Sequence, residues 1–458
     1  NFSSELMMPR KELGRPLKKP RTDAAAPKLS ASRVKRSPAP QKSKTSQGKE
    51  KAAEKTTEAT PPPAKKRKTA PRKAEAPLPS SFKIVAGSYE KLLYGLEGTI
   101  SCEEGSSIPT YNLEPIFIFP AHVSCIKVVA ASPHGGKWLA TGSADEIIKV
   151  WDLRRRKEIG GLMHHEGSIT HLTFPSRSHL LSASEDGTLC LFRARDWSVL
   201  RTLRGHKARV NSVAVHPSGK VALSVGKDRA LRMWDLMRGK GVASTKLGKE
   251  GEVVQWSTDG TLFVVQSAAI LDIYTTDMIL IHTITHPSRI HDVKFCRRVE
   301  GEGDILLVGA EDKKLTIYDV SSDPEKPPQK VTALVGHANR VKTFQTLSVA
   351  LPSSSPRKST TIVATASSDG NIHVYDLAAL PSAEGKSVAE MSPVARYDTK
   401  GTRLTCVTLA DGEITQPVVN GKRKREDADQ DGQSGDEEEE DVDEWEEEVE
   451  GEEEMESE

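Results

Sequence analysis

The sequence predicts an all-β fold, a seven-bladed β-propeller with a disordered basic N-terminal tail and a disordered acidic C-terminal tail. Three observations predict it. An aromatic residue followed by a polar one, most often Asp, ends successive units at regular distances. Each unit alternates apolar and polar residues between turns rich in Gly, Pro and Asp, which is the pattern of β-strands joined by tight connections. The two ends of the region each supply part of one further unit.

The repeat is defined by the pair that ends each unit. The six endings are VWD (150–152), LFR (191–193), MWD (233–235), IYT (273–275), IYD (317–319) and VYD (374–376). Their aromatic residues are 41, 42, 40, 44 and 57 positions apart. A period of about 40–45 residues with a Trp-Asp ending is typical of four-stranded propeller blades. The region therefore resembles a WD-repeat β-propeller.

The strands of a unit can be read directly in the third one. RVNSVAVHPSG (209–219), KVALSVGKD (220–228) and RALRMWDL (229–236) each contain one strand, and the first ends in a Pro-Ser-Gly turn. Two polar insertions lengthen later units, LPSSSPRKST (351–360) in the sixth and RRVEGEGD (297–304) in the fifth. We expect both to be surface loops between the first two strands, the first of them mobile.

Histidine and aspartate recur at fixed places in most units. In WD-repeat blades a His before the first strand, a strand Ser or Thr, a turn Asp and the third-strand Trp form a buried hydrogen-bond chain, and buried polar groups are tolerated when they are satisfied in this way. We therefore interpret these residues as structural rather than metal-binding or catalytic. The predicted network comprises His122, Asp145, Trp151, His206, Asp228, Trp234, His337 and Asp369. The fourth unit lacks the His and the turn Asp. The strands of its blade should therefore be the least firmly held together by such hydrogen bonds.

A seventh blade is predicted from the stretch KIVAGSYEKLLYGLE (83–97). It aligns with WLATGSADEIIKVWD (138–152), the second and third strands of a blade. In this alignment we expect Tyr94 to take the place of Trp151. Tyr89-Glu90 takes the place of Ala144-Asp145. An isolated hairpin is marginally stable in water, so these two strands need a partner.

Both ends of the region complete this blade. PIFIFPAH (115–122) supplies an outer strand, and residues 98–114 are expected to form a loop. TRLTCVTLAD (402–411), which follows the sixth unit, supplies the missing innermost strand. The predicted propeller spans residues 81–412, with the last blade closed by 402–411 and 83–122. Such closure leaves no long exposed edge.

Charge separates the chain into three parts. Residues 1–80 contain 21 Lys or Arg and 7 Asp or Glu, and residues 421–458 contain 4 and 21. Residues 81–420 contain 40 and 36, a net charge of +4. The segments 1–80 and 413–458 have too few apolar residues to offset chain entropy, and we expect them to be disordered. The acidic tail could mimic nucleic acid for a basic partner, shield the basic head or keep the chain soluble.

Short basic runs in the tails resemble nuclear import signals. The residues concerned are Lys65, Lys66, Arg67, Lys68, Lys422, Arg423, Lys424 and Arg425. A phosphate-binding segment or a solvated linker would have the same composition.

Several function classes are disfavoured. No apolar run reaches the ~18–20 residues of a membrane span, and no secretory segment is seen. The five cysteines, Cys102, Cys125, Cys190, Cys296 and Cys406, have no paired spacing and are expected to be buried thiols in a reducing compartment.

The first residue is Asn1, so the true start could be Met7, Met8 or further upstream. No phosphate loop, nucleophile elbow or zinc motif is present. We therefore expect an intracellular protein that is not an enzyme and has no cofactor.

Basic residues recur in the predicted loops of the propeller. Those selected as possible contacts with a partner or with RNA are Arg154, Arg155, Arg156, Lys157, Arg209, Arg229, Arg340 and Lys342, and Arg204, Lys207 and Lys227 lie nearby in the sequence. A phosphate-rich partner would be attracted by them. The alternative is an ordinary set of solvated charges.

The resemblance can be narrowed. VAGSYEKLLYGL, HPSGKVALSVGKDRALRMWDLMRGK, VVQWSTDGTLFVV, ATASSDGNIHVYDL and TRLTCV occur in this order. Together they resemble the p21-activated-kinase-interacting WD-repeat protein and its fungal counterpart over residues 82–410. The resemblance implies a non-enzymatic scaffold in assembly of the large (60S) ribosomal subunit in the nucleolus. Its partners would be assembly factors and ribosomal proteins of pre-60S particles, and rRNA, with the protein a monomer in a larger complex.

Alternatives remain open. Animal members resemble negative regulators of p21-activated kinase, which implies a signalling scaffold that binds and inhibits a protein kinase. WDLR (151–154) fits the short Trp-Asp-x-Arg pattern of substrate receptors of cullin-4 ubiquitin ligases. The acidic tail alone would also suit a histone chaperone.

Overall fold

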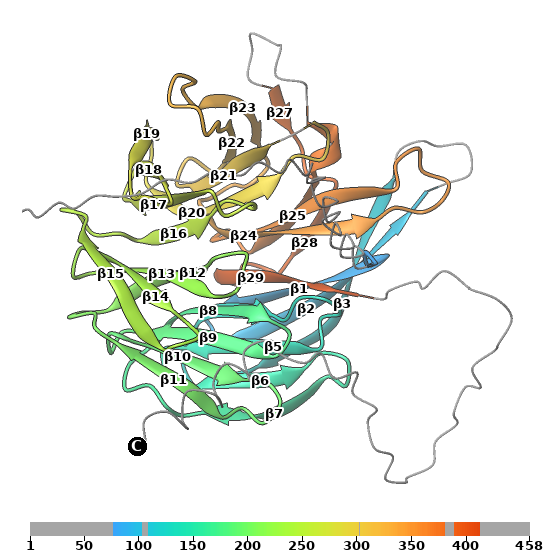
Figure 1. Ribbon diagram of the computed structural model, residues 1–458. Coiled ribbons are helices and arrows are strands. Elements are labelled where there is room, and N and C mark those ends of the chain that lie inside the picture. Colours follow the sequence, from blue (N-terminus) through green and yellow to red (C-terminus); the bar gives the residue numbers. More distant parts are fainter. Residues whose placement is uncertain (1–76, 103–108, 302, 381–388, 413–458) are drawn as a thin grey trace, which may run out of the picture. The chain divides into compact units, whose positions relative to one another are not determined.

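The computed structural model describes residues 77–102, 109–301, 303–380 and 389–412, which belong to one compact unit. These residues form seven β-sheets, and the innermost strand of each sheet contacts the innermost strands of both neighbouring sheets (Figure 1). The predicted all-β, seven-bladed propeller is confirmed. The predicted tails lie outside the described residues, apart from residues 77–80.

Six blades follow the repeat units in chain order. Blade 1 contains β4 (Ile126–Ala131), β5 (Trp138–Ser143), β6 (Ile148–Asp152) and β7 (Lys157–Leu162). Blade 2 contains β8 (Ile169–Ser176), β9 (His179–Ser184), β10 (Thr188–Arg193) and β11 (Val199–Arg204). Blade 3 contains β12 (Val210–Val215), β13 (Val221–Gly226), β14 (Ala230–Asp235) and β15 (Lys240–Lys246). Blade 4 contains β16 (Val253–Trp256), β17 (Leu262–Ser267), β18 (Ile270–Thr275) and β19 (Leu280–Thr285).

Blades 5 and 6 are interlocked. Blade 5 contains β20 (Ile290–Arg297), β21 (Asp304–Ala310), β22 (Leu315–Asp319) and β23 (Gln329–Leu334). Blade 6 contains β24 (Val341–Ala350), β25 (Ser359–Ser367), β26 (Asn371–Asp376) and β28 (Ala395–Asp398). Between β26 and β28 the chain forms the short 3₁₀ helix η1 (Leu377–Ala379) and then β27 (Ala389–Met391), which pairs in parallel with β23 of blade 5.

The strand β27 is a feature that the four-stranded repeat did not predict. Val335 N donates to Met391 O at 2.9 Å, and Lys314 Nζ lies 2.5 Å from Glu390 Oε1. Met391 also packs against the apolar cluster shared by blades 5 and 6. The segment therefore covers the outer edge of blade 5, which would otherwise expose unpaired backbone groups.

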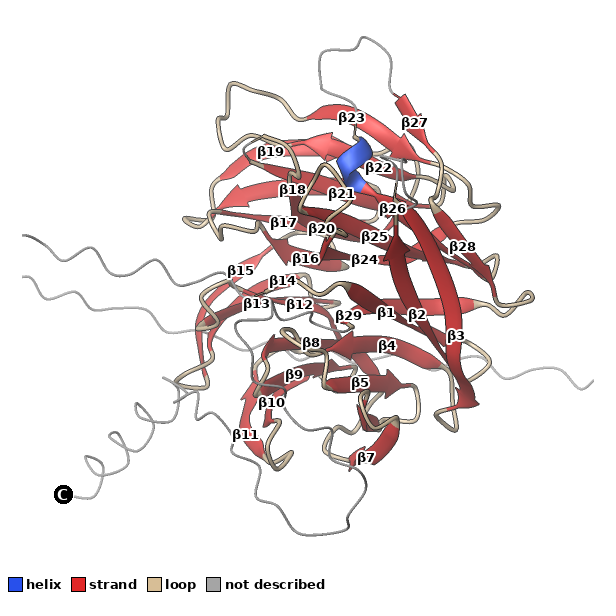
Figure 2. Cartoon of the chain, turned by 90° about the vertical axis from the view of Figure 1, so that its right-hand side faces the viewer, coloured by secondary structure: helices blue, strands red, loops and turns tan. Residues whose placement is uncertain are grey.

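The closing blade is shared by the two ends of the described region. Its strand order is β29 (Leu404–Asp411), β1 (Ser81–Ser88), β2 (Leu92–Ser101) and β3 (Thr110–Pro120). β29 pairs with β1 in antiparallel register, for example Ile84 with Leu409. The predicted pairing of the 83–97 hairpin with residues 402–411 is confirmed. β29 also contacts β24 and β4, and Figure 2 shows it between them.

The loop predicted at 98–114 is wrong for residues 98–101 and 110–114, which belong to strands, while residues 103–108 lie outside the described residues. β2 and β3 continue as a long hairpin, in which Gly98 pairs with Leu113 and Ser101 with Thr110. The reason is burial against blade 6, because Tyr111 belongs to the cluster shared by these two blades. Its hydroxyl donates to Asp376 Oδ2 at 2.7 Å. The Gly and Ser residues of this segment concealed the alternation of Ile100, Tyr111 and Leu113.

The place predicted for Tyr94 is also wrong. Trp151 pairs with Leu139 in blade 1, and the equivalent pair in the closing blade is Leu96 with Ile84. Leu96 therefore takes the place of Trp151. Tyr94 lies two positions earlier, and its hydroxyl forms a 2.7 Å hydrogen bond with Thr402 Oγ1. The prediction matched Tyr94 to Trp151 because both are aromatic, and this match is two residues away from the true equivalent, Leu96.

The insertions lengthen hairpins as expected. Residues 351–358 connect β24 and β25, and residues 298–303 connect β20 and β21. In the sixth unit the strands extend further than predicted, because Ser359 and Thr360 pair with Ala350 and Val349.

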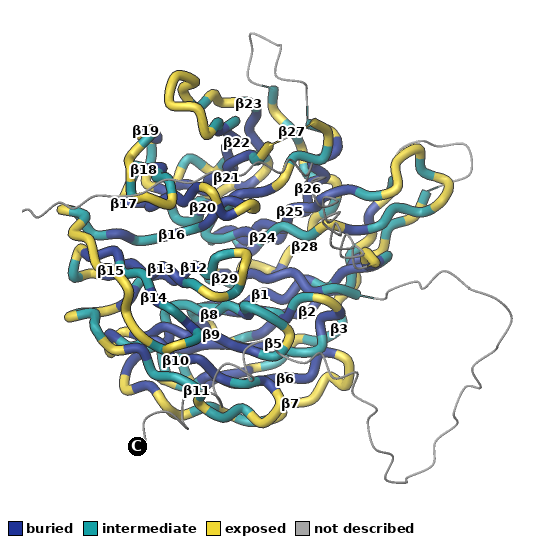
Figure 3. The backbone as a smooth tube through the Cα atoms, in the orientation of Figure 1, coloured by how far each residue is buried: buried dark blue, intermediate teal, exposed yellow. Residues whose placement is uncertain are grey.

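The core lies between blades and not inside any one of them. Second strands such as β9 and β17 are buried along their whole length, whereas β15 at the outer edge of blade 3 is exposed throughout (Figure 3). Each apolar cluster joins neighbouring blades; one of them contains Leu409 of β29, Phe82 of β1 and Ile362 of β25. Stability therefore depends on an unbroken series of blade-to-blade contacts.

Leu409→Ala tests the closing blade. Leu409 is 6% exposed. Truncating a buried Leu removes apolar contacts and leaves a cavity, which lowers the free energy of unfolding by about 2–5 kcal/mol. We expect chemical denaturation to show that loss. Val394, which is 43% exposed, gives the control Val394→Ala, for which little change is expected. Equal stabilities of the two variants would contradict burial of β29 between its neighbours.

Candidate interaction surface

One face of the ring carries the loops that the repeat motif marks. Because neighbouring strands of a blade are antiparallel, connections alternate between its two ends. The blade-to-blade connections, which contain the motif His, share one end with the turns between second and third strands, which contain the motif Asp. Asp145 Oδ2 accepts from Val123 N at 3.2 Å, and Asp228 Oδ2 from Lys207 N at 3.0 Å. We call this end the His–Asp face.

Blades 1 and 3 each contain a complete hydrogen-bond chain that holds their own strands together. His122 Nδ1 lies 3.0 Å from Asp145 Oδ2, and its Nε2 lies 2.8 Å from Thr141 Oγ1. Trp151 Nε1 donates to the same hydroxyl at 3.0 Å. Blade 3 repeats this geometry with His206, Asp228, Ser224 and Trp234, at distances of 3.0, 2.7 and 2.7 Å.

Blade 6 has the same chain of hydrogen bonds, but no tryptophan takes part in it. His337 Nδ1 lies 3.3 Å from Asp369 Oδ2, and Nε2 lies 2.8 Å from Thr365 Oγ1. His373 stacks on the His337 ring with centroids 3.9 Å apart. Tyr375, near the end of β26, donates from its hydroxyl to Val335 O at 3.0 Å. The predicted pair His337 and Asp369 is thus brought together.

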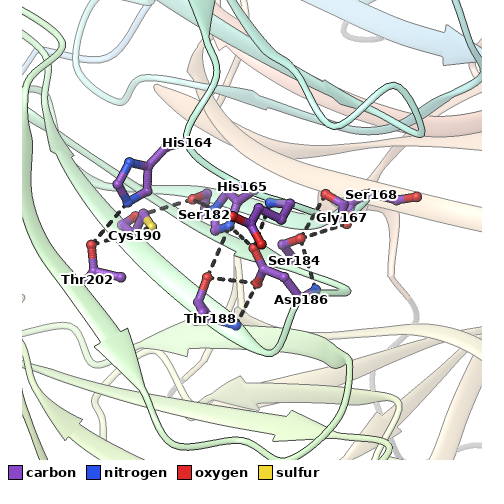
Figure 4. Close-up of polar contacts among 11 residues, drawn as sticks. His164, His165, Gly167, Ser168, Ser182, Ser184, Asp186, Thr188, Cys190 and Thr202 are labelled. Carbon is purple, nitrogen blue, oxygen red and sulfur yellow. Dashed lines mark hydrogen bonds and ion pairs between the residues drawn. The ribbon is translucent and has the colours of Figure 1, made fainter.

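Blade 2 contains a chain that the predicted residue set omitted. Figure 4 shows His165 between Asp186, at 2.9 Å, and Ser182, at 2.7 Å, with Thr188 beside the carboxylate. Burial lowers the pKa of His165, but its hydrogen bond to Asp186 and its proximity to Cys190 outweigh this and raise the pKa to about 9. Phe192 takes the tryptophan position of this blade. The His and Asp were visible in the sequence, and the Phe obscured the match.

Blades 4 and 5 depart from the pattern. In blade 5, Val308 stands where the strand hydroxyl belongs, and His286 Nε2 is 3.7 Å from Asp312 Oδ2. In blade 4, Gln266 Nε2 instead donates to Ala268 O at 2.8 Å and Ile290 O at 3.3 Å. Among the described residues, four buried atoms of blade 4 lack a hydrogen-bond partner: Trp256 Nε1, Gln266 Oε1, Ser267 Oγ and His282 Nε2. The weaker tying of blade 4 stays a prediction.

The His–Asp pairs are unsuited to surface chemistry. The side chains of His122 and His206 have 0% exposure, and burial lowers the pKa of both. Their ring nitrogens already lie within hydrogen-bonding distance of carboxylate and hydroxyl oxygens, which leaves no free lone pair for a ligand. In the described part of the chain, no group of three or more His, Cys, Asp or Glu could hold a metal ion.

The eight selected basic residues do not form one site. Arg209 and Arg229 lie on the His–Asp face of blade 3, whereas Arg340 and Lys342 lie on that face of blade 6, with blades 4 and 5 between them. Arg154, Arg155 and Arg156 lie in the turn between β6 and β7, and Lys157 begins β7; the alternation of connections places this turn on the opposite face. The sequence shows which residues are basic; the topology decides which of them can act together.

The basic residues also differ in how far their charges are neutralised. Arg340 Nη1 lies 3.7 Å from Glu311 Oε1, and its Nε donates to Ser368 Oγ at 3.2 Å. Burial lowers the pKa of Lys342, and the guanidinium groups of Arg340, Arg403 and Arg289 lower it further. Arg340 is thus partly compensated, whereas Lys342, in the innermost strand β24, is crowded by like charges.

On the opposite face, Arg154 is held by the fold. Its Nη2 donates to Gly135 O at 3.1 Å, and its backbone N–H donates to Asp152 Oδ1 at 2.9 Å. Arg155, Arg156 and Lys157 are exposed. Binding of a cullin-4 adaptor through Arg154 stays a prediction. The basic tail residues Lys65–Lys68 and Lys422–Arg425 lie outside the described residues.

Comparisons with known proteins agree with this geometry. The family model "WD domain, G-beta repeat" matches residues 113–152, 156–193 and 197–235. The p21-activated protein kinase-interacting protein 1-like of Danio rerio is 34% identical over 72% of this chain and 80% of its own length. MAK11 of Saccharomyces cerevisiae is 32% identical over 78% and 89%.

The chain belongs to this WD-repeat family. A further member, Shk1 kinase-binding protein 15 of Schizosaccharomyces pombe, is 26% identical over 76% of this chain and 91% of its own length. Two of these three relatives are named as kinase-interacting or kinase-binding proteins, which suits a scaffold. Within the described residues, no helix is long and apolar enough to cross a membrane.

His206→Gln tests the structural role of the network. The change leaves Asp228 and Ser224 with a partner of different shape. We expect the free energy of unfolding at neutral pH to fall by about 1–3 kcal/mol. Because burial lowers the pKa of His206 below its ordinary value of 6.5, the unfolded state binds the extra proton. Wild-type stability should therefore fall as the pH drops below 6.5, and the variant should lose that part of the pH dependence.

Denaturation curves at several pH values measure this, with exposed His164→Gln as control. An unchanged pH profile for His206→Gln, or an equal change for His164→Gln, would show that His206 is not the buried, neutral group described above.

Proposed function

We propose that the chain is a non-enzymatic assembly factor in nucleolar biogenesis of the large (60S) ribosomal subunit. Family membership carries this proposal, because the resemblance in the sequence implies that role and the chain covers most of the length of its relatives. Assembly factors and ribosomal proteins of pre-60S particles, together with rRNA, would be its partners.

The architecture suits a docking platform. A closed ring tied by buried His–Asp chains holds its loops in fixed positions, and pre-organised loops lose little conformational entropy when a partner binds. The motif histidines and aspartates of blades 1, 2, 3 and 6 are engaged in these chains, so recognition falls to the loop residues around them.

A nucleolar location follows as part of the proposal. The basic runs at Lys65–Lys68 and Lys422–Arg425 have the composition of nuclear import signals, and a chain with a basic head and an acidic tail suits an environment of rRNA and basic ribosomal proteins.

Depletion in the source organism tests the proposed function. We expect free 60S subunits to fall relative to 40S subunits, because precursors lacking a scaffold fail to mature. A tagged copy should co-sediment with pre-60S particles in a sucrose gradient. Normal polysome profiles after depletion would contradict the proposal.

A second function is favoured by the names of the relatives, which are described as kinase-interacting or kinase-binding proteins. On this alternative the propeller binds a p21-activated kinase and inhibits it. The purified full chain should then retain the kinase from a lysate and slow its activity. Absence of both effects would remove the alternative and leave the assembly role unaffected.

A further inference from the structure

We propose that the His–Asp face of blade 3 binds the phosphate backbone of double-stranded RNA. The binding surface, the blade 3 patch, comprises Lys207, Lys227, Arg229 and Lys246 of blade 3 together with Arg204, which ends β11 of the adjoining blade 2. The inference rests on the proposed function for the identity of the RNA, which would be a helical segment of rRNA in a subunit precursor. The binding chemistry itself is argued from the residues.

Three connections of the fold bring the patch together. Lys207 N donates to Asp228 Oδ2 at 3.0 Å, which holds the blade-to-blade connection against the turn of Lys227 and Arg229. Leu247 N donates to Arg229 O at 2.8 Å, and Lys246 pairs with Ala230, so the end of β15 lies beside the same turn. Arg204 ends β11, two residues before His206.

The side chains of the patch are exposed and uncompensated. All five residues are exposed, and none of their side chains takes part in an ion pair or hydrogen bond with the described residues. Two of their basic neighbours are neutralised: Arg209 pairs with Glu250 at 3.2 Å and Lys249 with Asp272 at 2.8 Å. The nearest carboxylate, Asp228, is occupied by His206 and by two backbone N–H groups. Their charges are therefore balanced only by water and small ions, which a polyanion would displace.

Positive charge is concentrated in this one blade. Residues 205–250 contain ten Lys or Arg and three Asp or Glu, a net charge of +7, whereas residues 81–420 as a whole have +4. The remainder of the propeller is thus slightly acidic. Of the ten basic residues, Lys220, Arg238 and Lys240 belong to the opposite end of the blade, and Arg232 lies within β14, which leaves six at or near the His–Asp face. A local field of this kind attracts a phosphate backbone and orients it toward this face.

The composition of the patch favours a duplex backbone over other anions. Protein interfaces are depleted in Lys at their centres and enriched in aromatic residues, and single-stranded nucleic acid is bound by stacking bases on aromatic rings. The patch contains neither aromatic nor large apolar side chains. Lys and Arg contacts to phosphates read helix shape without reading sequence, which is how double-stranded RNA is recognised.

A matched pair of full-chain variants tests the proposal. The patch variant carries Lys207→Gln, Lys227→Gln and Arg229→Gly, and the control carries Arg155→Gln, Arg156→Gly and Lys157→Gln on the opposite face. Arg229 and Arg156 both have positive φ, 59° and 51°, so Gly relieves backbone strain at each site. Each variant loses three positive charges, and both retain the basic head. Thermal melting checks that both fold like wild type.

Binding is measured by fluorescence anisotropy with a labelled RNA duplex of about 20 base pairs, from about 50 to about 300 mM salt. For the patch variant we expect at least ~10-fold weaker binding near 100 mM salt, and a salt dependence reduced by about three ions. The control should stay within about twofold of wild type. Equal losses in both variants, or no loss in the patch variant, would overturn the proposal.

Two further probes separate the alternatives. A poly-glutamate peptide that loses as much affinity for the patch variant as the duplex does would show an acidic-protein surface and overturn the RNA assignment. A single-stranded RNA bound more tightly than the duplex would do the same. If the patch variant binds the duplex normally but the chain still co-sediments with pre-60S particles, the patch proposal fails alone; if 60S levels survive depletion while the patch binds duplex, the proposed function fails alone.

Discussion

The antiparallel pairing of β29 with β1 is the interaction on which the rest of the structure depends. It joins residues more than 300 positions apart, as the hydrogen bond from Thr405 Oγ1 to Gly87 O shows. Each blade buries its two faces against its neighbours, so an open ring would expose two blade faces and a free strand edge. Pairing of residues so far apart is intrinsically slow, because the loop-closure entropy is lost before the contact is gained.

Closure also decides what chemistry is left for function. The His, Asp and hydroxyl groups of four blades are engaged in tying strands together, and burial keeps His122 and His206 away from solvent. What the ring presents is a set of fixed loops whose charges differ from blade to blade. A nearly neutral propeller can therefore hold a local basic surface at blade 3, where side chains without partners gather, while Arg340 is partly compensated by Glu311 and Lys342 is crowded by like charges. Function on such a scaffold is a matter of which blade faces which partner.

Much of the architecture could be predicted because each blade repeats a short-range pattern. The endings VWD and MWD, the turn Asp residues and the match of 83–97 to 138–152 all report contacts within one hairpin. Long-range packing was harder. Ile100 and Tyr111 are strand residues because blade 6 covers them, and β27 forms because blade 5 has an edge to fill; neither partner is adjacent in sequence. For the surface, the sequence identified basic runs, but only the alternation of connections separates Arg154–Lys157 from Arg209 and Arg229, and only the ion pairs distinguish neutralised from free charges.

Hydrogen–deuterium exchange of the full chain, followed by mass spectrometry, tests the central claim most directly. If β29 is the innermost strand of the closing blade, peptides covering residues 82–88 and 404–411 should exchange together and about as slowly as those of β25, while peptides of the exposed strand β15 exchange faster. Exchange of residues 404–411 at the rate of an unstructured chain, with residues 82–88 unprotected on one side, would contradict the closed ring.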